Sequence, residues 1–239
     1  MRRRFDVNQR NRYRPVINWV LVLGLLAPSL LAGCTDGVET DGPIGQPIGG
    51  DVYQVVPLSC IGEIHVRATA MAIAEDLVAT AAHSFEGAVG ARLRDVGGTE
   101  VQAEVVYADF DKDIALLRLG RPNTNLFTGA EAEDNQSITV VGFPSAETGP
   151  EIKEGTVLRT VTVTLDGVGR RQALELEVDI ERGDSGGPVV DEQSRAVGMV
   201  FAGARSGARG WAVTYDEVEE AVARLEDGAE LLLPDRCRE

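Results

Sequence analysis

From about Val52 onward, the sequence is a series of short apolar runs separated by glycines and polar turn residues. Runs of this length, alternating or continuous, predict β-strands. The strand candidates are Glu63–Ala68, Leu77–Ala81, Gly90–Arg94, Val101–Tyr107, Ile114–Leu119, Ile138–Val141, Thr156–Leu165, Gln172–Val178, Pro188–Val190, Ala196–Phe201 and Trp211–Val213. Many short strands at regular spacing indicate an all-β sandwich or barrel, in contrast to the β/α alternation of parallel sheets.

One helix is expected, close to the C-terminus. Thr214 or Asp216 is placed to cap it, and an apolar stripe ends before Gly228 (Val218, Ala221, Val222 and Leu225). Between two of the strand candidates, Asp166-Gly167 is typical of a hairpin turn.

The first 33 residues are typical of an export signal. Six arginines precede residue 16, and an apolar run follows from Val16 to Ala32. This run is shorter than the roughly 20 residues that span a bilayer, so a signal peptide is favoured over a permanent membrane helix. Leu31-Ala32-Gly33-Cys34 resembles the bacterial lipoprotein box, which implies a lipid on Cys34. The alternative is a chance cysteine beside an ordinary cleavage site.

Residues 34–51 are rich in Gly, Pro and Asp and have no hydrophobic period, so they are expected to carry the lipid and form a flexible tether. With Cys34 assigned to the lipid, Cys60 and Cys237 remain. Export would place both where disulfides persist, so a bridge between them is predicted, with two unpaired buried thiols as the alternative.

The net charge and the numbers of histidines and cysteines exclude two kinds of binding site. The chain has 23 Lys and Arg against 38 Asp and Glu, a net charge of −15, so a nucleic acid is not an expected partner. Only two histidines and three cysteines occur, which excludes a zinc cluster of Cys and His ligands. We therefore expect no metal and no cofactor.

The sharpest local signal is Gly183-Asp184-Ser185-Gly186-Gly187-Pro188, directly before an apolar run. A serine flanked by glycines is typical of a nucleophile on a tight turn, where a carbonyl can approach and backbone N–H groups stay available. The alternative is a plain glycine-rich turn. The same residues fit the Gly-x-Ser-x-Gly elbow of α/β-hydrolases, but that fold places its histidine after the serine, and no histidine follows His83.

A serine hydroxyl needs a base to take its proton, and the base needs an orienting acid. His83 ends an apolar strand candidate among small residues and is the expected base, whereas His65 alternates within a strand candidate and is expected to be structural. Asp113 directly precedes a buried strand candidate and is the expected acid, with Asp109 and Asp111 as rivals on spacing.

Three segments resemble the triad motifs of chymotrypsin/trypsin-like serine proteases in identity, order and approximate spacing (Thr80–His83, Asp113–Leu116 and Gly183–Pro188). The resemblance covers about residues 52–226. It implies two packed six-stranded β-barrels, over residues 52–122 and 123–239, with the terminal helix in the second. The cleft between the barrels would hold the catalytic residues.

By the same resemblance, Ser185 attacks the scissile carbonyl and His83 acts first as base and then as acid. Asp113 fixes the imidazole, and the N–H groups of Gly183 and Ser185 hold the oxyanion. Animal members of the family are activated when a new amino terminus pairs with the acid that corresponds to Asp184. Activation of that kind is not expected here, because cleavage near residue 48 would remove the lipid anchor.

The resemblance also implies a substrate site. The strand around Val200, Phe201 and Ala202 would pair with the substrate backbone. Asp179, six residues before Ser185, matches the carboxylate of trypsin-like primary pockets, which predicts cleavage after Arg or Lys. The alternative is that Asp179 is one more acid on an acidic surface.

Together these observations predict an exported, lipid-anchored serine endopeptidase of the bacterial cell envelope that acts on proteins or peptides. A catalytically silent, protease-like module that binds peptides or partner proteins is the second hypothesis, and an esterase that does not cleave peptides is the third. The sequence leaves the physiological substrate and the oligomeric state open.

Overall fold

The computed structural model describes residues 49–144, 149–165, 168–205 and 208–228. The expected signal peptide, Cys34, most of the tether, the Asp166-Gly167 turn and Cys237 lie outside these residues. In the described part of the chain, no helix is both long and apolar enough to cross a bilayer.

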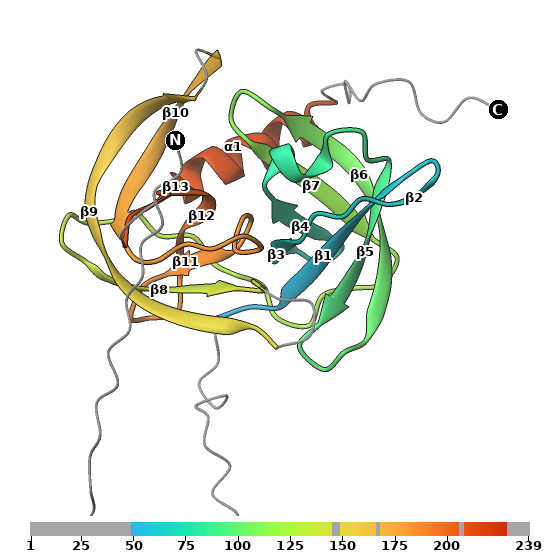
Figure 1. The fold of residues 1–239 in the computed structure, drawn as a ribbon, viewed down its shortest axis with the longest axis horizontal. Helices are drawn as coiled ribbons and strands as arrows, with labels where there is room; N and C mark the ends of the chain where they lie inside the picture. Colours follow the sequence, from blue (N-terminus) through green and yellow to red (C-terminus); the bar gives the residue numbers. More distant parts are fainter. Residues whose placement is uncertain (1–48, 145–148, 166–167, 206–207, 229–239) are drawn as a thin grey trace, which may run out of the picture. The chain divides into compact units, whose positions relative to one another are not determined.

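The first sheet has the strand order β2-β1-β3-β4-β7-β6-β5 and closes through an antiparallel pairing of β1 with β5 (Figure 1, blue to green). Its strands, and the short 3-10 helix η1 that follows β4, are β1 (Val52–Ser59), β2 (Gly62–Glu63), β3 (Ala68–Ala74), β4 (Leu77–Thr80), η1 (Ala82–Phe85), β5 (Gly90–Asp95), β6 (Glu100–Asp109) and β7 (Ile114–Leu119). Closure leaves β2 as a short extension outside a six-stranded barrel.

The second sheet is a closed barrel of six antiparallel strands in the order β10-β13-β12-β11-β8-β9, with β9 pairing with β10 (Figure 1, yellow to orange). Its strands are β8 (Ser137–Gly142), β9 (Glu151–Leu165), β10 (Val168–Glu177), β11 (Pro188–Val190), β12 (Ala196–Gly203) and β13 (Gly210–Thr214). The expected fold class, two six-stranded β-barrels with a C-terminal helix, is confirmed.

Strand β7 shows why its sequence is apolar at nearly every position. Ala115, Leu117 and Leu119 face the interior of the first barrel, whereas Ile114 and Leu116 belong to a cluster that also contains side chains of the second barrel and the helix. Because alternate residues of a strand point to opposite faces, a strand buried on both faces must be apolar on both. The cluster that contains Ile114 and Leu116 is the apolar layer that joins the two barrels.

The predicted strand over Glu63–Ala68 is wrong. Strand β2 ends at Glu63, the next four residues form no strand, and β3 begins at Ala68. The segment alternates in sequence but pairs with no strand: the Ile64 N–H donates to the Pro57 carbonyl, and Val66 is exposed. Strands β1 and β3 are absent from the predicted set, since β1 contains a proline and β3 is rich in alanine, and both residues are uncommon in strands.

Helix α1 (Tyr215–Glu226) confirms the expected terminal helix. Thr214 is its N-cap residue, but the side chain makes no capping hydrogen bond. The predicted apolar stripe packs inward, with Val218 and Ala221 buried in the cluster between the barrels. The helix contacts β12 and β13 of its own barrel and β6 and β7 of the first.

Candidate active site

His83 is held by Asp113 through both backbone and side chain. The His83 N–H donates to Asp113 Oδ1 at 2.7 Å, and His83 Nδ1 lies 2.8 Å from Asp113 Oδ2. The Asp113 carbonyl also accepts the N–H of Ala82, at 3.2 Å. Asp113 adopts a φ of 60°, a left-handed conformation that Asp tolerates better than most residues. These contacts fix the imidazole, and they leave Nε2 as the nitrogen available for a nucleophile.

The two rival acids lie elsewhere. The Asp109 carboxylate accepts the N–H of Lys112 at 2.9 Å and pairs with Arg224 at 3.3 Å. Asp111 is exposed, and neither rival contacts His83 among the described residues. Asp113 is therefore the carboxylate that orients this histidine.

Two glycines shape the loop that carries Ser185. Gly183 has a φ of 107° and Gly186 a φ of 87°, a region that side chains rarely allow. A Cβ at Gly183 would lie 2.3 Å from the Phe143 carbonyl oxygen, and one at Gly186 would lie 2.0 Å from that of Thr69. Among the described residues, the N–H groups of Gly183 and Ser185 donate to no acceptor. An oxyanion would find both donors available.

Thr69 of the first barrel binds the Ser185 loop of the second barrel through hydrogen bonds. Its N–H donates to the Ser185 carbonyl at 2.8 Å, and its hydroxyl donates to the Gly183 carbonyl at 2.7 Å. The same hydroxyl accepts the N–H of Phe143 at 2.9 Å, and Thr69 is fully buried. The sequence analysis missed Thr69, because nothing in a threonine of an alanine-rich run signals a contact more than a hundred residues away.

His83 and Ser185 line one pocket of about 410 Å³, here called the nucleophile pocket, together with His65, Arg67, Arg182 and Gly183. No hydrogen bond joins the Ser185 hydroxyl to the His83 ring in the described structure. Such hydrogen bonds are often long in substrate-free enzymes. His65 was expected to be a structural residue of a strand face, but it lies in the loop before β3 and borders this pocket.

Opposing effects set the pKa of His83. Burial lowers it, but the hydrogen bond to Asp113 and the negative charge of Asp113 raise it above the ordinary value, while the positive charge of Arg171 lowers it. The net direction is upward, so the His83 imidazole loses its proton at a higher pH than an ordinary histidine does.

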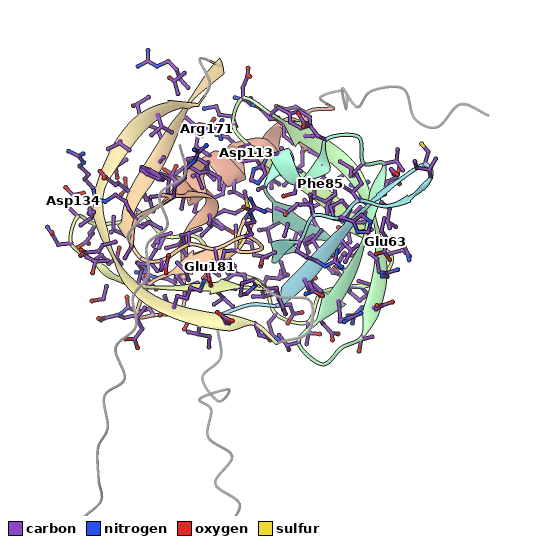
Figure 2. All side chains as sticks on the ribbon, viewed as in Figure 1. Glu63, Phe85, Asp113, Asp134, Arg171 and Glu181 are labelled. Carbon is purple, nitrogen blue, oxygen red and sulfur yellow. The ribbon has the colours of Figure 1, made fainter. Side chains whose placement is uncertain are left out.

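Arg171 of β10 lies beside the catalytic pair, although it belongs to the other barrel (Figure 2). Its Nη1 is 3.6 Å from Asp113 Oδ2, and its guanidinium stacks 5.0 Å above the ring of Phe201. Arg171 is only 3% exposed, and its Nε and Nη1 have no hydrogen-bond partner among the described residues. The sequence analysis missed it, because an arginine at the start of a strand usually lies on the surface.

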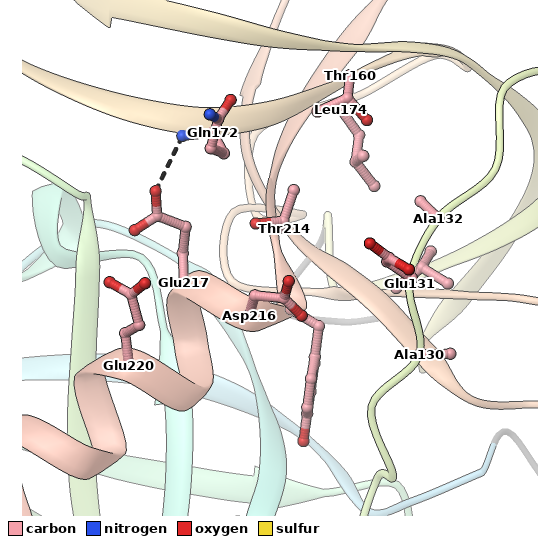
Figure 3. Close-up of a pocket in the computed structure, with 12 residues that line it drawn as sticks. Ala130, Glu131, Ala132, Thr160, Gln172, Leu174, Thr214, Asp216, Glu217 and Glu220 are labelled. Atoms are coloured by element: carbon pink, nitrogen blue, oxygen red, sulfur yellow. Dashed lines mark hydrogen bonds between the residues drawn. The ribbon is translucent and has the colours of Figure 1, made fainter.

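Glu217 of α1 binds the residues that lie next to Asp113 and Arg171 in the chain. Its carboxylate accepts a hydrogen bond from the Lys112 ammonium at 2.8 Å and from the Gln172 N–H at 2.9 Å, the latter drawn in Figure 3. Lys112 precedes Asp113 in the chain and Gln172 follows Arg171. The helix therefore links both barrels through residues next to Asp113 and Arg171 in the chain.

Asp184 has an ammonium partner inside the barrel. Its fully buried carboxylate lies 2.8 Å from Lys153 Nζ and accepts the N–H of Glu181 at 2.8 Å. Lys153 also pairs with Glu181 at 2.8 Å. Burial lowers the pKa of Lys153, but the hydrogen bonds to Asp184 and Glu181 raise it above its ordinary value. Lys153 thus supplies the positive charge that a new amino terminus supplies in activated members of the resembled family.

The predicted substrate-binding residues have different surroundings. Val200 is buried, and its N–H and carbonyl are bonded to Gly187 and Gly186, so its backbone is not available to a substrate. Phe201 is buried beneath Arg171, and Ala202 is partly exposed at the bulge in the pairing of β12 with β13.

The predicted pocket carboxylate, Asp179, is exposed. Its neighbour Ile180 fills the space between two glycines: a Cβ at Gly203 would lie 2.9 Å from Ile180 Cβ, and one at Gly210 would lie 2.4 Å from Ile180 Cγ1. Specificity for basic residues stays a prediction, and the side chain that lies against these two glycines is the apolar Ile180.

The remaining predictions concern the cysteines and metals. Cys60 lies in the turn between β1 and β2, and its expected partner Cys237 is outside the described residues, so the bridge stays a prediction. No group of three or more potential ligands that could hold a metal ion occurs in the described ranges.

Comparison with known proteins agrees with this geometry. Residues 68–199 match the trypsin-like peptidase domain family. The serine protease Rv3671c of Mycobacterium tuberculosis is 28% identical over 206 residues, which cover 83% of this chain and 52% of that protein. The chloroplastic Protease Do-like 2 of Arabidopsis thaliana is 29% identical over 148 residues, 58% of this chain and 24% of that protein. The chain thus spans only about half the length of the mycobacterial relative.

Solved structures show the same fold at low identity. The active form of Rv3671c from M. tuberculosis superimposes with a TM-score of 0.67 at 22% identity, covering 80% of this chain and 85% of that chain. The HtrA-type protease AlgW, with a bound tripeptide, gives a TM-score of 0.67 at 21% identity, covering 75% of this chain and 62% of that chain. With more than half of its residues matched by one domain family and the same two-barrel fold, the chain belongs to the trypsin-like peptidases.

Proposed function

We propose that the chain is an active serine endopeptidase that cleaves peptide bonds through His83, Asp113 and Ser185. The observation that carries this proposal is the nucleophile pocket, in which the histidine oriented by Asp113 faces the same space as a serine on a glycine-shaped turn. Acyl transfer requires a nucleophile, a base, an orienting acid and donors for the oxyanion; we assign these roles to Ser185, His83, Asp113 behind the imidazole, and the backbone N–H groups of the serine turn.

In the first half of the proposed reaction, the Ser185 hydroxyl attacks the scissile carbonyl carbon while His83 Nε2 takes its proton. The carbonyl oxygen becomes an oxyanion that accepts hydrogen bonds from the N–H groups of Gly183 and Ser185. The intermediate collapses when the C–N bond breaks, and His83 returns the proton to the departing amine.

In the second half, a water molecule attacks the acyl-enzyme and gives a proton to His83. The bond between the carbonyl carbon and Ser185 Oγ then breaks, and Oγ recovers its proton from His83. Asp113 stays ionised throughout and stabilises the imidazolium that forms twice in the cycle.

The test uses the full-length protein in detergent and a fluorophosphonate probe, which reacts only with activated serines. We expect labelling at Ser185, located by mass spectrometry, that is lost in Ser185→Ala and His83→Ala. Ser137→Ala is the matched control, because Ser137 is exposed on β8 of the same barrel. A folded protein that is not labelled would instead favour the silent binding module.

We further propose that the peptidase acts outside the cytoplasm, anchored by a lipid on Cys34 after removal of residues 1–33. The sequence of the signal and the lipoprotein box supports this location. One relative is named as a probable periplasmic serine endoprotease, from Halomonas elongata. Mass spectrometry of the N-terminal peptide should show a diacylglyceryl group on Cys34, whereas Cys34→Ala should lack that mass and keep the labelling of Ser185. An unmodified Cys34 thiol at the mature terminus would refute the lipid anchor.

A further inference from the structure

Two arginines border the nucleophile pocket without a carboxylate partner. Arg67 and Arg182 form no ion pair with any described residue. Most other described arginines do pair with carboxylates (Arg92, Arg94, Arg118, Arg121, Arg159, Arg171, Arg195, Arg209 and Arg224). Two other arginines, Arg170 and Arg205, also lack a described carboxylate partner; like Arg182 they are exposed, but they line no part of this pocket.

The lack of partners is notable because carboxylates are abundant in this chain, which carries a net charge of −15. Among the described residues, no Asp or Glu lines the nucleophile pocket, and its lining residues other than the two arginines are uncharged or histidine. A pocket of about 240 Å³ at the start of α1 is the opposite case, because four carboxylates border it (Glu131, Asp216, Glu217 and Glu220; Figure 3). The described lining of the nucleophile pocket therefore carries two arginines and no carboxylate, although Asp113 and Glu86 act on His83 from outside that lining.

Arg67 is also poorly satisfied. Its Nη1 donates only to the neighbouring carbonyl of Val66, at 3.3 Å, and its Nε is buried with no partner among the described residues. A guanidinium carries donors arranged to bind a carboxylate in two places at once, and a buried donor without a partner is costly. A carboxylate from a bound substrate would supply what this side chain lacks.

The position of the two arginines indicates which part of a substrate they would meet. Arg182 directly precedes Gly183, the expected oxyanion donor, and Arg67 lies two residues before Thr69, which holds the Ser185 loop. No residue of β12 lines the pocket. A substrate whose N-terminal half runs along the end of β12 beyond Val200, at Phe201 and Ala202, would therefore place in this pocket the residues that follow the scissile bond.

We propose that the nucleophile pocket binds a carboxylate on the leaving-group side of the scissile bond, between Arg67 and Arg182. The ligand is an Asp or Glu side chain within the first two residues after the cleaved bond, or the free C-terminal carboxylate of a short substrate. This proposal deepens the proposed endopeptidase function and rests on it.

The test is the digestion of a mixed peptide library, with the cleaved bonds read by mass spectrometry. We expect Asp and Glu to exceed Asn and Gln about tenfold at the first two positions after the cleaved bond, the range of one charge-assisted hydrogen-bonded pair. The excess should fall toward one in the double variant Arg67→Gln/Arg182→Gln and persist in Arg170→Gln. High salt should reduce it, because this pocket is open to solvent.

Two further arms make the result decisive. Peptides with free or amidated C-termini separate the two carboxylate sources, because a terminal carboxylate would favour cleavage only near free C-termini. The same samples are labelled with fluorophosphonate, so labelled protein without an acidic preference overturns this proposal and leaves the peptidase standing. If no labelling occurs, capture of the library by immobilised Ser185→Ala protein decides the question, since equal retention of acidic and amide peptides also overturns it.

Discussion

Replacing Lys153 by methionine tests whether an internal ion pair shapes the nucleophile loop. Lys153 Nζ lies 2.8 Å from Asp184 Oδ2, and the Asp184 side chain is completely buried. Met keeps most of the length and apolar surface of the lysine stem but removes the charge. The variant therefore leaves a buried carboxylate, one residue before the nucleophile, without its counter-ion.

The expected loss is about 3–5 kcal/mol in the free energy of unfolding, the range for a buried pair broken on one side. The direct attraction at 2.8 Å and an effective dielectric constant of 20 is about 6 kcal/mol, the same order. For a domain of this size, each kcal/mol lowers the melting temperature by about 2–4 °C. We expect the melting temperature to fall by about 6–20 °C.

The pH dependence has a definite sign. The parent lysine has a raised pKa, so its contribution to stability is complete below about pH 10 and is lost as the pH rises through the folded value. Lys153→Met removes the titrating group, so the variant should not show this loss of stability at alkaline pH.

The assay combines thermal unfolding with the rate of fluorophosphonate labelling at Ser185. Arg118→Met is the control, because it breaks an exposed pair with Asp76 and should cost about 0.5 kcal/mol or less. The double variant Lys153→Met/Asp184→Asn should recover most of the stability, because it removes the unpaired charge. A Lys153→Met protein within about 0.5 kcal/mol of the parent, with an unchanged labelling rate, would refute the reasoning.

Three other changes have expected outcomes. Arg171→Met removes a charge that lowers the pKa of His83, so the acidic limb of the kcat/KM profile should move to higher pH, and an unmoved limb would contradict this role. Thr69→Val breaks the hydrogen bonds to Gly183 and Phe143, so the labelling rate should fall about tenfold and recover in Thr69→Ser, whereas equal rates would show that the loop needs no such tie. Ile180→Ala should shift cleavage toward larger apolar residues before the scissile bond, as measured on the peptide library, and an unchanged preference would place the primary pocket elsewhere.

Most of the fold was predictable because its signals are local. The run from Ile114 to Leu119 is apolar on both faces and became a strand with the same bounds, as did Pro188–Val190. The predictions failed where tertiary context decides the structure. The segment after Glu63 alternates like a strand but is a loop, and the alanine-rich β3 is a strand because it is paired on both sides.

The residues of the candidate site also fall into two groups, those that the sequence suggests and those that only the structure reveals. His83, Asp113 and Ser185 stand in short motifs whose residue types the chemistry demands, so a sequence alone can suggest them. Thr69 and Arg171 act on those residues from the opposite barrel, and no short motif records a contact between distant segments. Their roles become visible only when both barrels are closed and packed together.

The carboxylate of Glu217 has a consequence for how much of the chain the proposed active site needs. It holds Lys112 and Gln172, and through them the backbone beside Asp113 and Arg171, yet it lies 32 residues beyond Ser185 and outside the segment matched by the domain family. A protein cut after β13 would keep all three triad residues and both closed sheets. It would nevertheless lose the carboxylate that holds the backbone beside Asp113, so we expect the smallest active form of the proposed peptidase to include the helix.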